Sequence, residues 1–408
     1  MSDFHVDIGP QYEGEAIRKE ELHIEFGGPK ITQKFEWARL KNADEIEDEK
    51  VEIIGPDIKD LGEGGPYPLA ILIDVAGEEL EADMEPVIER RIHMYANYME
   101  GVWHMAQRND IWVRVNKDAF KKGLNSLKEI GEILIMLYTS EIDAIEKISI
   151  TFITDKAKVE ELLPEAVKVY EARDKRALGL KDEDVDEFYC CVLCQSFAPT
   201  HSCIVAPSRV ANCGAMNWFD CKAAYKLDPE GPIFGFAKGE CLDDIRGEFT
   251  GGNEIIKSKS LGNYDRVYLH SAFEFPHTSC GCFQAICFYI PEVDAFGIIH
   301  RDFTGLTPDG VKFSSMAGST SGGKQIEGFC GIALELLRSP KFFQADGGRK
   351  RLVWLPKDVK ERYKDVLEAD GVYDKIATEE DVSSSDELVA FLEKVGHPWV
   401  KGEVELPG

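Results

Sequence analysis

Apolar residues recur along the first half of the chain with two periodicities, one typical of strands and one typical of helices. Period-two alternation and short apolar runs predict buried strands at residues 69–75, 111–115 and 148–153. Steps of three and four residues predict amphipathic helices at residues 83–106, 120–138 and 156–172. The first of these helices opens on Asp83-Met84-Glu85-Pro86, where an early proline and acidic residues favour a helix start.

The second half of the chain is richer in glycine and in short strands. Its apolar runs predict strands at residues 267–270, 283–290 and 295–300. Helical spacing predicts three further helices at residues 325–337, 357–367 and 385–395. Strands that alternate with helices predict an α/β to α+β fold of two mixed α/β domains joined by a charged linker. We place an acidic N-terminal arm, a first α/β domain, the linker and an α+β domain at residues 1–50, 51–175, 176–188 and 189–408.

The charge of the chain excludes one large class of ligands. Lysine and arginine number 47 against 74 aspartate and glutamate residues, a formal net charge of −27. Such a field repels a phosphate backbone, so we expect no nucleic-acid partner, and an anionic substrate would need a local basic patch. No apolar run approaches the roughly 18 residues of a membrane span, and the acidic start lacks the order of a signal peptide. We therefore expect a cytoplasmic protein without membrane contact.

Cysteine is the residue whose placement carries most chemistry. The chain has 11 cysteines, an odd number in a large chain with no export signal, which argues against a disulfide framework. None precedes Cys190, and six fall between Cys190 and Cys221. Because buried structural cysteines would scatter through both halves, this clustering indicates metal ligation.

Four of these cysteines form one closely spaced set, which reads Cys191-x2-Cys194-x8-Cys203-x9-Cys213. A Cys-x2-Cys pair lets one tight loop present two thiolates to a metal. Four thiolates satisfy either a [4Fe–4S] cluster or a structural zinc ion, and the spacing alone leaves both open. Cys190 adjoins the first ligand and could replace it, but Cys191 keeps the two-residue interval.

A second cysteine pair lies far along the chain, at Cys280-Gly281-Cys282. Two thiolates separated by one residue can place both sulfurs and the intervening backbone nitrogens around one ion in a plane, and Gly281 has no Cβ to obstruct that chelate. Two sulfurs with two deprotonated amides favour square-planar Ni(II) or Cu(II) over tetrahedral zinc. The plainer alternative is a strand that carries both thiols on one face, since positions two apart share a face.

Together these cysteines resemble a known metal-cluster pattern. Their five intervals, including the gap from Cys213 to Cys280, are similar to the A-cluster pattern of the CO-dependent acetyl-CoA synthase family. Cys-Gln-Ser-Phe-Ala-Pro-Thr-His at 194–201 and His-Thr-Ser-Cys-Gly-Cys-Phe at 277–283 also resemble that family. The likeness extends from about Pro68 to the C-terminus.

The resemblance implies a role for each residue of the pattern. It implies a [4Fe–4S] cluster held by four thiolates, those of Cys191, Cys194, Cys203 and Cys213. The sulfur of Cys194 would bridge this cluster to a proximal nickel ion. That nickel and a distal nickel would share the sulfurs of Cys280 and Cys282. The backbone nitrogens of Gly281 and Cys282 would complete the distal site, while the proximal nickel would keep an open position for substrate.

Two further residues lie close to the cysteine pattern. Phe197 resembles the aromatic residue that shields the open face of the proximal nickel, although an ordinary core phenylalanine fits the sequence equally well. His201 could support the cluster ligands from behind, although a purely structural hydrogen bond is the commoner fate of such a histidine.

The resemblance also implies a reaction and its partners. A methyl group from a corrinoid iron–sulfur protein and CO would join on the proximal nickel, and the coenzyme A thiolate would carry off the acetyl group, reversibly. The first domain would bind coenzyme A, whose phosphates need basic residues and whose adenine stacks on aromatic rings. The candidates are Arg90, Arg91, Trp103, Arg108, Trp112 and Arg114. Solvated helix charges and core tryptophans are the alternative for each.

The chain departs from bacterial members of this family, which carry a large N-terminal domain that docks on carbon monoxide dehydrogenase. Only a short acidic arm precedes the first domain here, so we expect a naturally short form or a cut chain with weakened or absent docking. Two rival interpretations remain open. One is an iron–sulfur electron-transfer protein with an incidental Cys-x-Cys pair, and the other is a zinc-stapled binding module.

One segment imitates a nucleotide-binding motif. Residues 318–325 read Gly-Ser-Thr-Ser-Gly-Gly-Lys-Gln, which nearly spells a P-loop. The last position must be serine or threonine to bind magnesium, and it is Gln325; no buried strand precedes the segment either. We therefore reject an ATPase and expect a plain glycine-rich loop.

Overall fold

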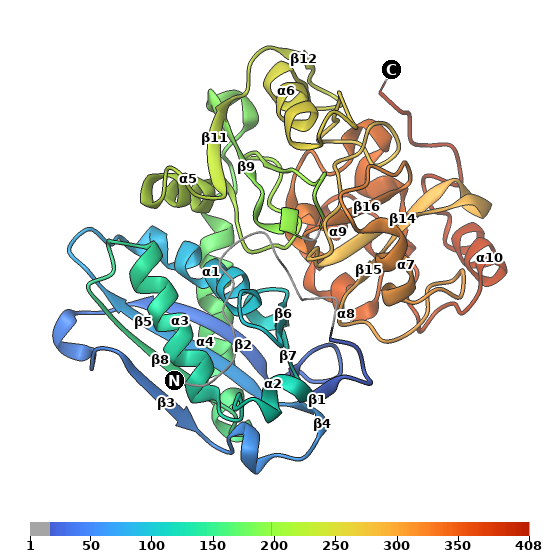
Figure 1. Ribbon diagram of the computed structural model, residues 1–408. Helices are drawn as coiled ribbons and strands as arrows, with labels where there is room; N and C mark the ends of the chain where they lie inside the picture. Colours follow the sequence, from blue (N-terminus) through green and yellow to red (C-terminus); the bar gives the residue numbers. More distant parts are fainter. Residues whose placement is uncertain (1–16, 197, 408) are drawn as a thin grey trace. The chain divides into compact units, whose positions relative to one another are not determined.

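The computed structural model describes residues 17–196 and 198–407 (Figure 1). The chain divides into two compact units, the first formed by residues 1–177 and 219–234 and the second by residues 178–218 and 235–408. The division at Ala177 falls beside the predicted linker, but residues 219–234 join the first unit rather than the second domain. Along the described residues, no helix has the length and apolar character needed to cross a bilayer.

The first unit contains two four-stranded sheets. One has the order β2-β5-β8-β3, with strands at Lys34–Leu40, Leu69–Ala76, Lys147–Ile153 and Lys50–Ile54. The other has the order β4-β1-β7-β6, with strands at Gly64–Tyr67, Leu22–Gly27, Trp112–Asn116 and Val102–Met105. Residues 22–40 fall within the predicted N-terminal arm of residues 1–50, and they supply one strand to each sheet.

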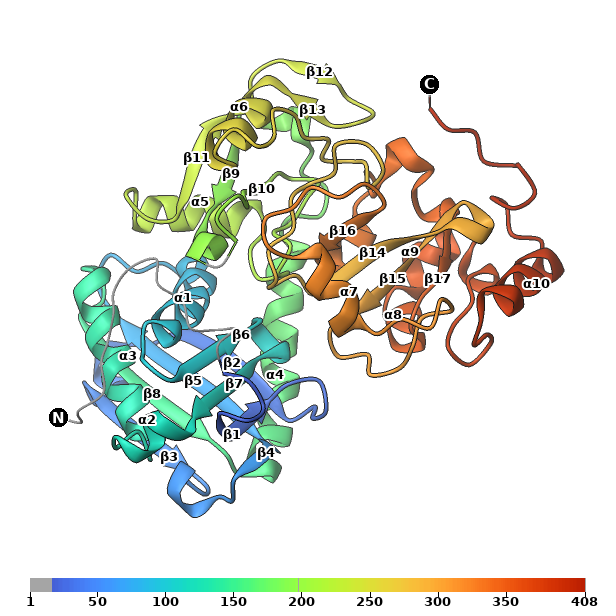
Figure 2. The same ribbon diagram turned by 45° about the vertical axis from the view of Figure 1, so that its right-hand side comes forward.

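Helices cover both faces of the sheet that contains β5 (Figure 2). Helices α1, α2, α3 and α4 of this unit span Glu85–Asn97, Lys117–Lys121, Leu127–Glu141 and Lys156–Lys175. Ala70 and Leu72 of β5 share a core with buried residues of α4. The intervening Ile71 and Ile73 are also buried and point to the opposite face, where α1 and α3 pack, because strand side chains alternate.

The strands from residue 187 onward form three further sheets. A four-stranded sheet has the order β16-β14-β15-β17, with strands at Phe329–Ile332, Ala285–Ile290, Ala295–His300 and Leu352–Trp354. A three-stranded sheet has the order β10-β9-β11, with strands at Cys203–Val205, Glu187–Cys191 and Ile233–Ala237. The third pairs β12 with β13, at Cys241–Asp243 and Glu248–Phe249.

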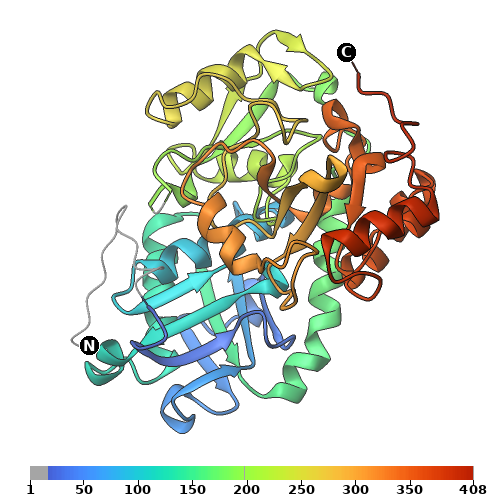
Figure 3. The same ribbon diagram turned by 90° about the vertical axis from the view of Figure 1, so that its right-hand side faces the viewer.

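Six helices follow β9 along the described chain, and α5 lies almost entirely in the part that joins the first unit. Helices α5 to α10 span Trp218–Leu227, Thr250–Lys259, Phe313–Thr320, Lys357–Arg362, Lys364–Ala369 and Ser385–Val395. Figure 3 shows α7, in orange, beside the hairpin of β14 and β15. The core of the second unit forms where this sheet meets α8 and α9, around Phe296, Leu352 and Leu367. The two mixed units confirm the predicted α/β to α+β class.

Most predicted elements are present, but several differ from the sequence analysis, among them the helix predicted at 357–367, which is divided at Tyr363 into α8 and α9. The helix predicted at 83–106 ends at Asn97, because Gly101 turns the chain at a φ of 78° into β6. The helix predicted at 120–138 is divided near Gly123, which has a φ of 113°. Residues 325–337, predicted helical, contain β16 instead, and residues 267–270 form no strand.

Candidate metal centre

Two of the four clustered cysteines face each other across a pair of short strands. Cys191 ends β9 and Cys203 begins β10, and the antiparallel register places them directly opposite each other. Opposite side chains in such a pair share a face, with Cβ atoms roughly 4.5–5.5 Å apart. Cys190 is opposite Ile204 and points to the other face, because successive strand residues alternate. The strand geometry therefore favours Cys191 over Cys190 as a ligand.

Two more cysteines lie close to this strand pair. The backbone N–H of Asn212 donates to Cys203 Sγ at 3.4 Å, which ties the loop that carries Cys213 to β10. Burial raises the pKa of the Cys203 thiol well above its usual range. Three neighbouring thiols raise that pKa further, those of Cys191, Cys213 and Cys280. Because such an effect requires proximity, the strand pair, the loop and the Cys-x-Cys segment converge.

The Cys-x-Cys segment is an irregular loop that precedes β14. The sequence predicted a strand from residue 283, but β14 begins at Ala285. The backbone N–H of Cys282 donates to Cys280 Sγ at 3.3 Å, so the loop curls around its own first thiol. Both thiols are buried, whereas Gly281 between them is partly exposed. The alternative of a strand with both thiols on one face does not hold for this segment.

The thiols of Cys194, Cys280 and Cys282 hydrogen bond to one another. These bonds, together with burial, raise the pKa of Cys194 well above its usual range. Burial opposes ionisation of Cys280, but hydrogen bonds from the other two thiols and the nearby imidazole of His201 lower its pKa well below the usual range. Three sulfurs from two distant segments therefore lie together, a donor set suited to a soft metal.

Two buried histidines line the same region. The side chain of His201 is enclosed, and its Nδ1 lies 3.0 Å from Thr278 Oγ1. Nε2 of His277 accepts a hydrogen bond from the backbone N–H of Ile204 at 2.8 Å, and burial lowers the pKa of His277 well below its usual value. His277 is therefore a neutral acceptor that fixes β10, a role that the sequence did not reveal.

The donor set fits the group that the sequence resemblance implies. Among residues 17–196 and 198–407, no three His, Cys, Asp or Glu side chains have the arrangement of a preformed metal site. The six cysteines of the pattern are nevertheless all buried, and they converge from three segments of the chain. Thiolates select soft metals and iron–sulfur clusters. On donor chemistry, a thiolate-bound metal cluster fits these residues.

The remaining residues near the pattern have simpler surroundings. Phe197, expected to shield the proximal nickel, lies outside the described residues. Cys287 and Cys330 stand opposite each other on β14 and β16, inside the core of the second unit. Cys221 is buried and Cys241 is exposed. These surroundings agree with the structural roles that the sequence analysis leaves to the cysteines outside the pattern.

Three of the arginines predicted to bind coenzyme A are buried in the first unit. Arg90, Arg91 and Arg108 are only 2%, 4% and 4% exposed. Arg91 Nη2 lies 2.5 Å from Asp228 Oδ2, and Arg108 Nη1 donates to both carboxylate oxygens of Asp174 at 2.9 Å. Breaking a buried ion pair leaves an uncompensated charge. These arginines are therefore enclosed by the protein and not presented to a phosphate.

Arg114, Trp103 and Trp112 form a separate group on β6 and β7. The guanidinium carbon of Arg114 lies 4.3 Å from the ring centroid of Trp112 and 5.1 Å from that of Trp103. Both indole Nε1 atoms are buried without a hydrogen-bond partner among the described residues. The Arg114 side chain is 20% exposed and pairs with Glu25 at 2.7 Å. A partly exposed cation over aromatic rings keeps these three as candidates for coenzyme A binding.

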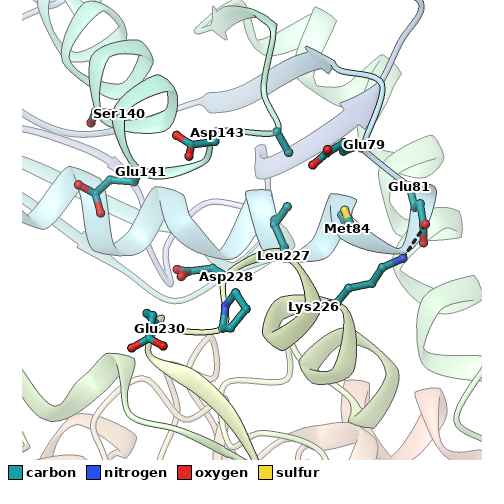
Figure 4. A pocket seen from close by; sticks show the side chains of 12 residues that line it. Glu79, Glu81, Met84, Ser140, Glu141, Asp143, Lys226, Leu227, Asp228 and Glu230 are labelled. Carbon is teal, nitrogen blue, oxygen red and sulfur yellow. Dashed lines mark hydrogen bonds and ion pairs between the residues drawn. The ribbon is translucent and has the colours of Figure 1, made fainter.

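The first unit also contains a pocket of about 660 Å³ (Figure 4). Six carboxylates line it, those of Glu79, Glu81, Glu141, Asp143, Asp228 and Glu230. Lys226 also lines the pocket, and its Nζ pairs with Glu81 at 2.6 Å. So negative a field disfavours a ligand that carries several phosphates. The pocket is therefore a poor site for coenzyme A.

Comparison with known proteins shows two family matches. Residues 4–159 match the family of the CO dehydrogenase/acetyl-CoA synthase complex beta subunit, and residues 170–404 match the C-terminal family of the ACS/CODH beta subunit. The acetyl-CoA decarbonylase/synthase complex subunit beta of Methanopyrus kandleri is 52% identical over 410 residues, which are 99% of this chain and 87% of that protein. The corresponding protein of Archaeoglobus fulgidus is 54% identical over 405 residues, 99% of this chain and 77% of that protein.

One solved structure is similar over a shorter stretch. It is the C-terminal domain of an acetyl-coenzyme A synthase alpha subunit, 40% identical in sequence, with a TM-score of 0.28. The match covers 30% of this chain and 96% of that domain.

These matches place the chain among the subunits of CO dehydrogenase/acetyl-CoA synthase complexes. Within that class, the chain belongs to the family of CO dehydrogenase/acetyl-CoA synthase beta subunits. The sequence resemblance pointed to the acetyl-CoA synthase subunit, which is a related but different subunit. The comparisons correct that assignment to the beta subunit of the decarbonylase/synthase complex.

Proposed function

We propose that this protein holds the acetyl-CoA-forming site, a [4Fe–4S] cluster joined to two nickel ions. A methyl group, CO and coenzyme A would be condensed there into acetyl-CoA, and the same site would cleave acetyl-CoA in reverse. The relatives' printed name, decarbonylase/synthase, agrees with both directions. Family membership and the six converging thiols support the proposal.

The proposed ligands follow the convergence of the cysteines. The [4Fe–4S] cluster would be held by Cys191, Cys194, Cys203 and Cys213. Cys194 would also bind the proximal nickel, together with Cys280 and Cys282, because these three thiols already contact one another. The distal nickel would take the sulfurs of Cys280 and Cys282 with the backbone nitrogens of Gly281 and Cys282.

When bound, the cluster would supply an electron-rich nickel with an open position at which a methyl group and CO can join. The chain's own contribution is to place the thiols and to exclude water. Cys194, Cys280 and Cys282 are each no more than 6% exposed. His277, held neutral, fixes β10 behind the cluster ligands. Partial exposure of Gly281 leaves one approach to the Cys-x-Cys loop.

The observation that carries the proposal is the contact of Cys194 with both thiols of the Cys-x-Cys loop. An electron carrier or a zinc-stapled module needs the four-cysteine set alone. Neither function requires two further thiols to meet one of those four, nor the second segment to be an irregular, curled loop. A bridged cluster requires both features.

Three partners complete the proposal. Coenzyme A would bind in the first unit, where Arg114, Trp103 and Trp112 form the best-placed group. A corrinoid iron–sulfur protein would deliver the methyl group, and carbon monoxide dehydrogenase would supply CO. The relatives are named as subunits of a complex, which agrees with such neighbours.

The test is exchange of labelled CO into the carbonyl carbon of acetyl-CoA, measured on oxygen-free protein loaded with iron and nickel. Exchange needs both directions of the reaction and no methyl donor. We expect exchange by the native chain, loss of exchange to background in Cys280→Ser, and unchanged exchange in Cys241→Ser, whose cysteine is exposed and outside the pattern. A fully loaded native chain without exchange, or equal exchange in Cys280→Ser, would contradict the proposal.

A further inference from the structure

Two peptide groups of the Cys-x-Cys loop have their carbonyl oxygens held by other segments. The oxygen of Gly281 accepts a hydrogen bond from Arg301 Nη2 at 2.6 Å. The oxygen of Cys280 accepts one from the backbone N–H of Gly322 at 2.8 Å. The nitrogens of these same two peptide groups belong to Cys282 and Gly281. They are the two nitrogens that would complete the distal nickel site under the proposed function.

The β14–β15 hairpin brings Arg301 to this loop. Arg301 follows β15, and its backbone N–H donates to the oxygen of Gln284 at 2.9 Å, which extends the pairing of the two strands. Its Nη2 also donates to the oxygen of Phe283 at 2.8 Å. The guanidinium carbon lies 5.3 Å from the ring centroid of Phe313 on α7. The fold therefore holds the positive charge against the backbone of the loop.

The glycine-rich segment 318–325 supplies the second donor. Gly322 and Gly323 have φ values of 89° and 78°, a conformation that glycine adopts readily. The N–H of Gly323 donates to the oxygen of Ser279 at 2.8 Å, next to the bond between Gly322 and Cys280. Helix α7 ends inside this segment, at Thr320, whereas a P-loop leads into a helix, so the segment has no P-loop architecture. The segment that imitates a phosphate loop instead holds the peptide backbone at Cys280.

The backbone chemistry of the distal site explains why these donors matter. A peptide nitrogen binds a metal ion strongly only after losing its proton, and resonance then places much of the negative charge on the carbonyl oxygen. Two thiolates and two such nitrogens carry more negative charge than a divalent ion neutralises. Fixed donors aimed at a developing oxyanion stabilise it, and a charged donor does so most strongly.

We propose that Arg301 is a positioning residue for nickel. Its guanidinium, aided by the Gly322 N–H, stabilises the negative charge that the Cys280–Cys282 backbone acquires on binding the metal. The N–H of Cys282 already points at Cys280 Sγ, so a metal that displaced this proton to solvent would be held by nitrogen and sulfur together. This inference rests on the proposed function, because it assumes that the loop binds nickel.

The test compares nickel binding by the native chain with that of Arg301→Gln and Arg301→Lys. Each iron-loaded protein is titrated with Ni(II) against a competing chelator, and the absorption of planar thiolate-bound nickel is recorded. Loss of a partner that supports metal ligands typically weakens metal affinity about 10–100-fold, and we expect that range for Arg301→Gln. Arg301→Lys, which keeps the charge, should recover part of the loss. Arg246→Gln is the matched control, because Arg246 pairs with Asp243 and Glu274 instead.

Iron content and the melting temperature separate this role from a general loss of folding. The inference predicts that both stay at the native level in Arg301→Gln while nickel affinity falls. Equal nickel affinity in Arg301→Gln and the native chain would overturn it. A joint loss of iron, melting temperature and nickel, or an Arg301→Lys no better than Arg301→Gln, would also overturn it. A native chain that binds no nickel would instead overturn the proposed function itself.

Discussion

Both units bury polar side chains that are usually exposed to solvent, but the neighbours of these side chains differ between the two units. In the second unit the thiols of Cys194, Cys280 and Cys282 meet one another. In the first unit the buried arginines Arg91 and Arg108 each meet a carboxylate. An ion pair already has its partner, whereas clustered thiols form a donor set that soft metals select. Burial alone therefore does not identify a metal site. A cluster of buried thiols is the better indication.

The largest expected effect separates two adjacent cysteines of β9. Cys191→Ser should lose nearly all cluster iron, because Cys191 faces Cys203 across the strand pair. Cys190→Ser should keep its iron, because Cys190 lies opposite Ile204 and points away. Iron per polypeptide after oxygen-free purification measures both. If the two variants lost iron equally, thiol position on the strand would not decide ligation.

Removing a buried arginine should harm stability rather than metal content. Arg108→Met leaves the carboxylate of Asp174 without its partner in a buried setting, which we expect to cost about 3–5 kcal/mol in the free energy of unfolding. Lys226→Met, which breaks an exposed pair with Glu81, should leave the free energy of unfolding nearly unchanged. Urea denaturation followed by tryptophan fluorescence checks both. Equal losses of unfolding free energy in the two variants would show that the pair of Arg108 and Asp174 does not behave as a buried ion pair.

We expect low pH to destabilise the second unit through His397, which is not one of its cysteines. Burial lowers the pKa of His397 to about 4, and its Nε2 lies 3.1 Å from the oxygen of Leu352. The unfolded chain takes up this proton near pH 6.5, so stability is complete above that pH and is lost as pH falls toward 4. Between pH 6.5 and 5 the loss is about 2 kcal/mol. His397→Gln should flatten the pH dependence of unfolding over this range; an unchanged slope would contradict the assignment.

The smallest effect concerns coenzyme A. Arg114→Gln removes a cation that lies over Trp103 and Trp112, and we expect about tenfold weaker coenzyme A binding, the value of one charge-assisted contact. The exposed Lys121 offers a control, since Lys121→Gln breaks only a surface pair. Quenching of tryptophan fluorescence by coenzyme A gives the dissociation constants. Equal constants would remove the Arg114 group from the candidate site.

Structural features that depend on residues close in the sequence, such as the ends of a helix, could be predicted from the sequence. Helix α10 covers the predicted residues 385–395, because Ser384 caps its start by accepting the N–H of Glu387 and Gly396 ends it at a φ of 64°. The predicted β15 likewise covers residues 295–300. The short cysteine intervals are local in the same sense, and the strand pair of β9 and β10 places Cys191 opposite Cys203.

Features set by distant partners were not predictable. Residues 329–332 have helical spacing, yet they form β16, because Cys330 pairs opposite Cys287 of β14. Arg91 and Arg108 have the composition of a phosphate site, but their carboxylate partners come from remote parts of the chain. Arg301 showed no signal, because its contact with the oxygen of Gly281 depends on the register of β14 and β15. A single sequence does not show which strands pair, so these long-range contacts could not be predicted from it.

The most direct test of the account is the metal content of the oxygen-free chain and of Cys280→Ser. Iron and nickel per polypeptide are measured after incubation with both metals. The account predicts about four irons and about two nickels in the native chain, with nickel lost and iron kept in the variant. Iron without nickel in the native chain would contradict the central claim and leave an electron carrier, and zinc alone would leave a structural module.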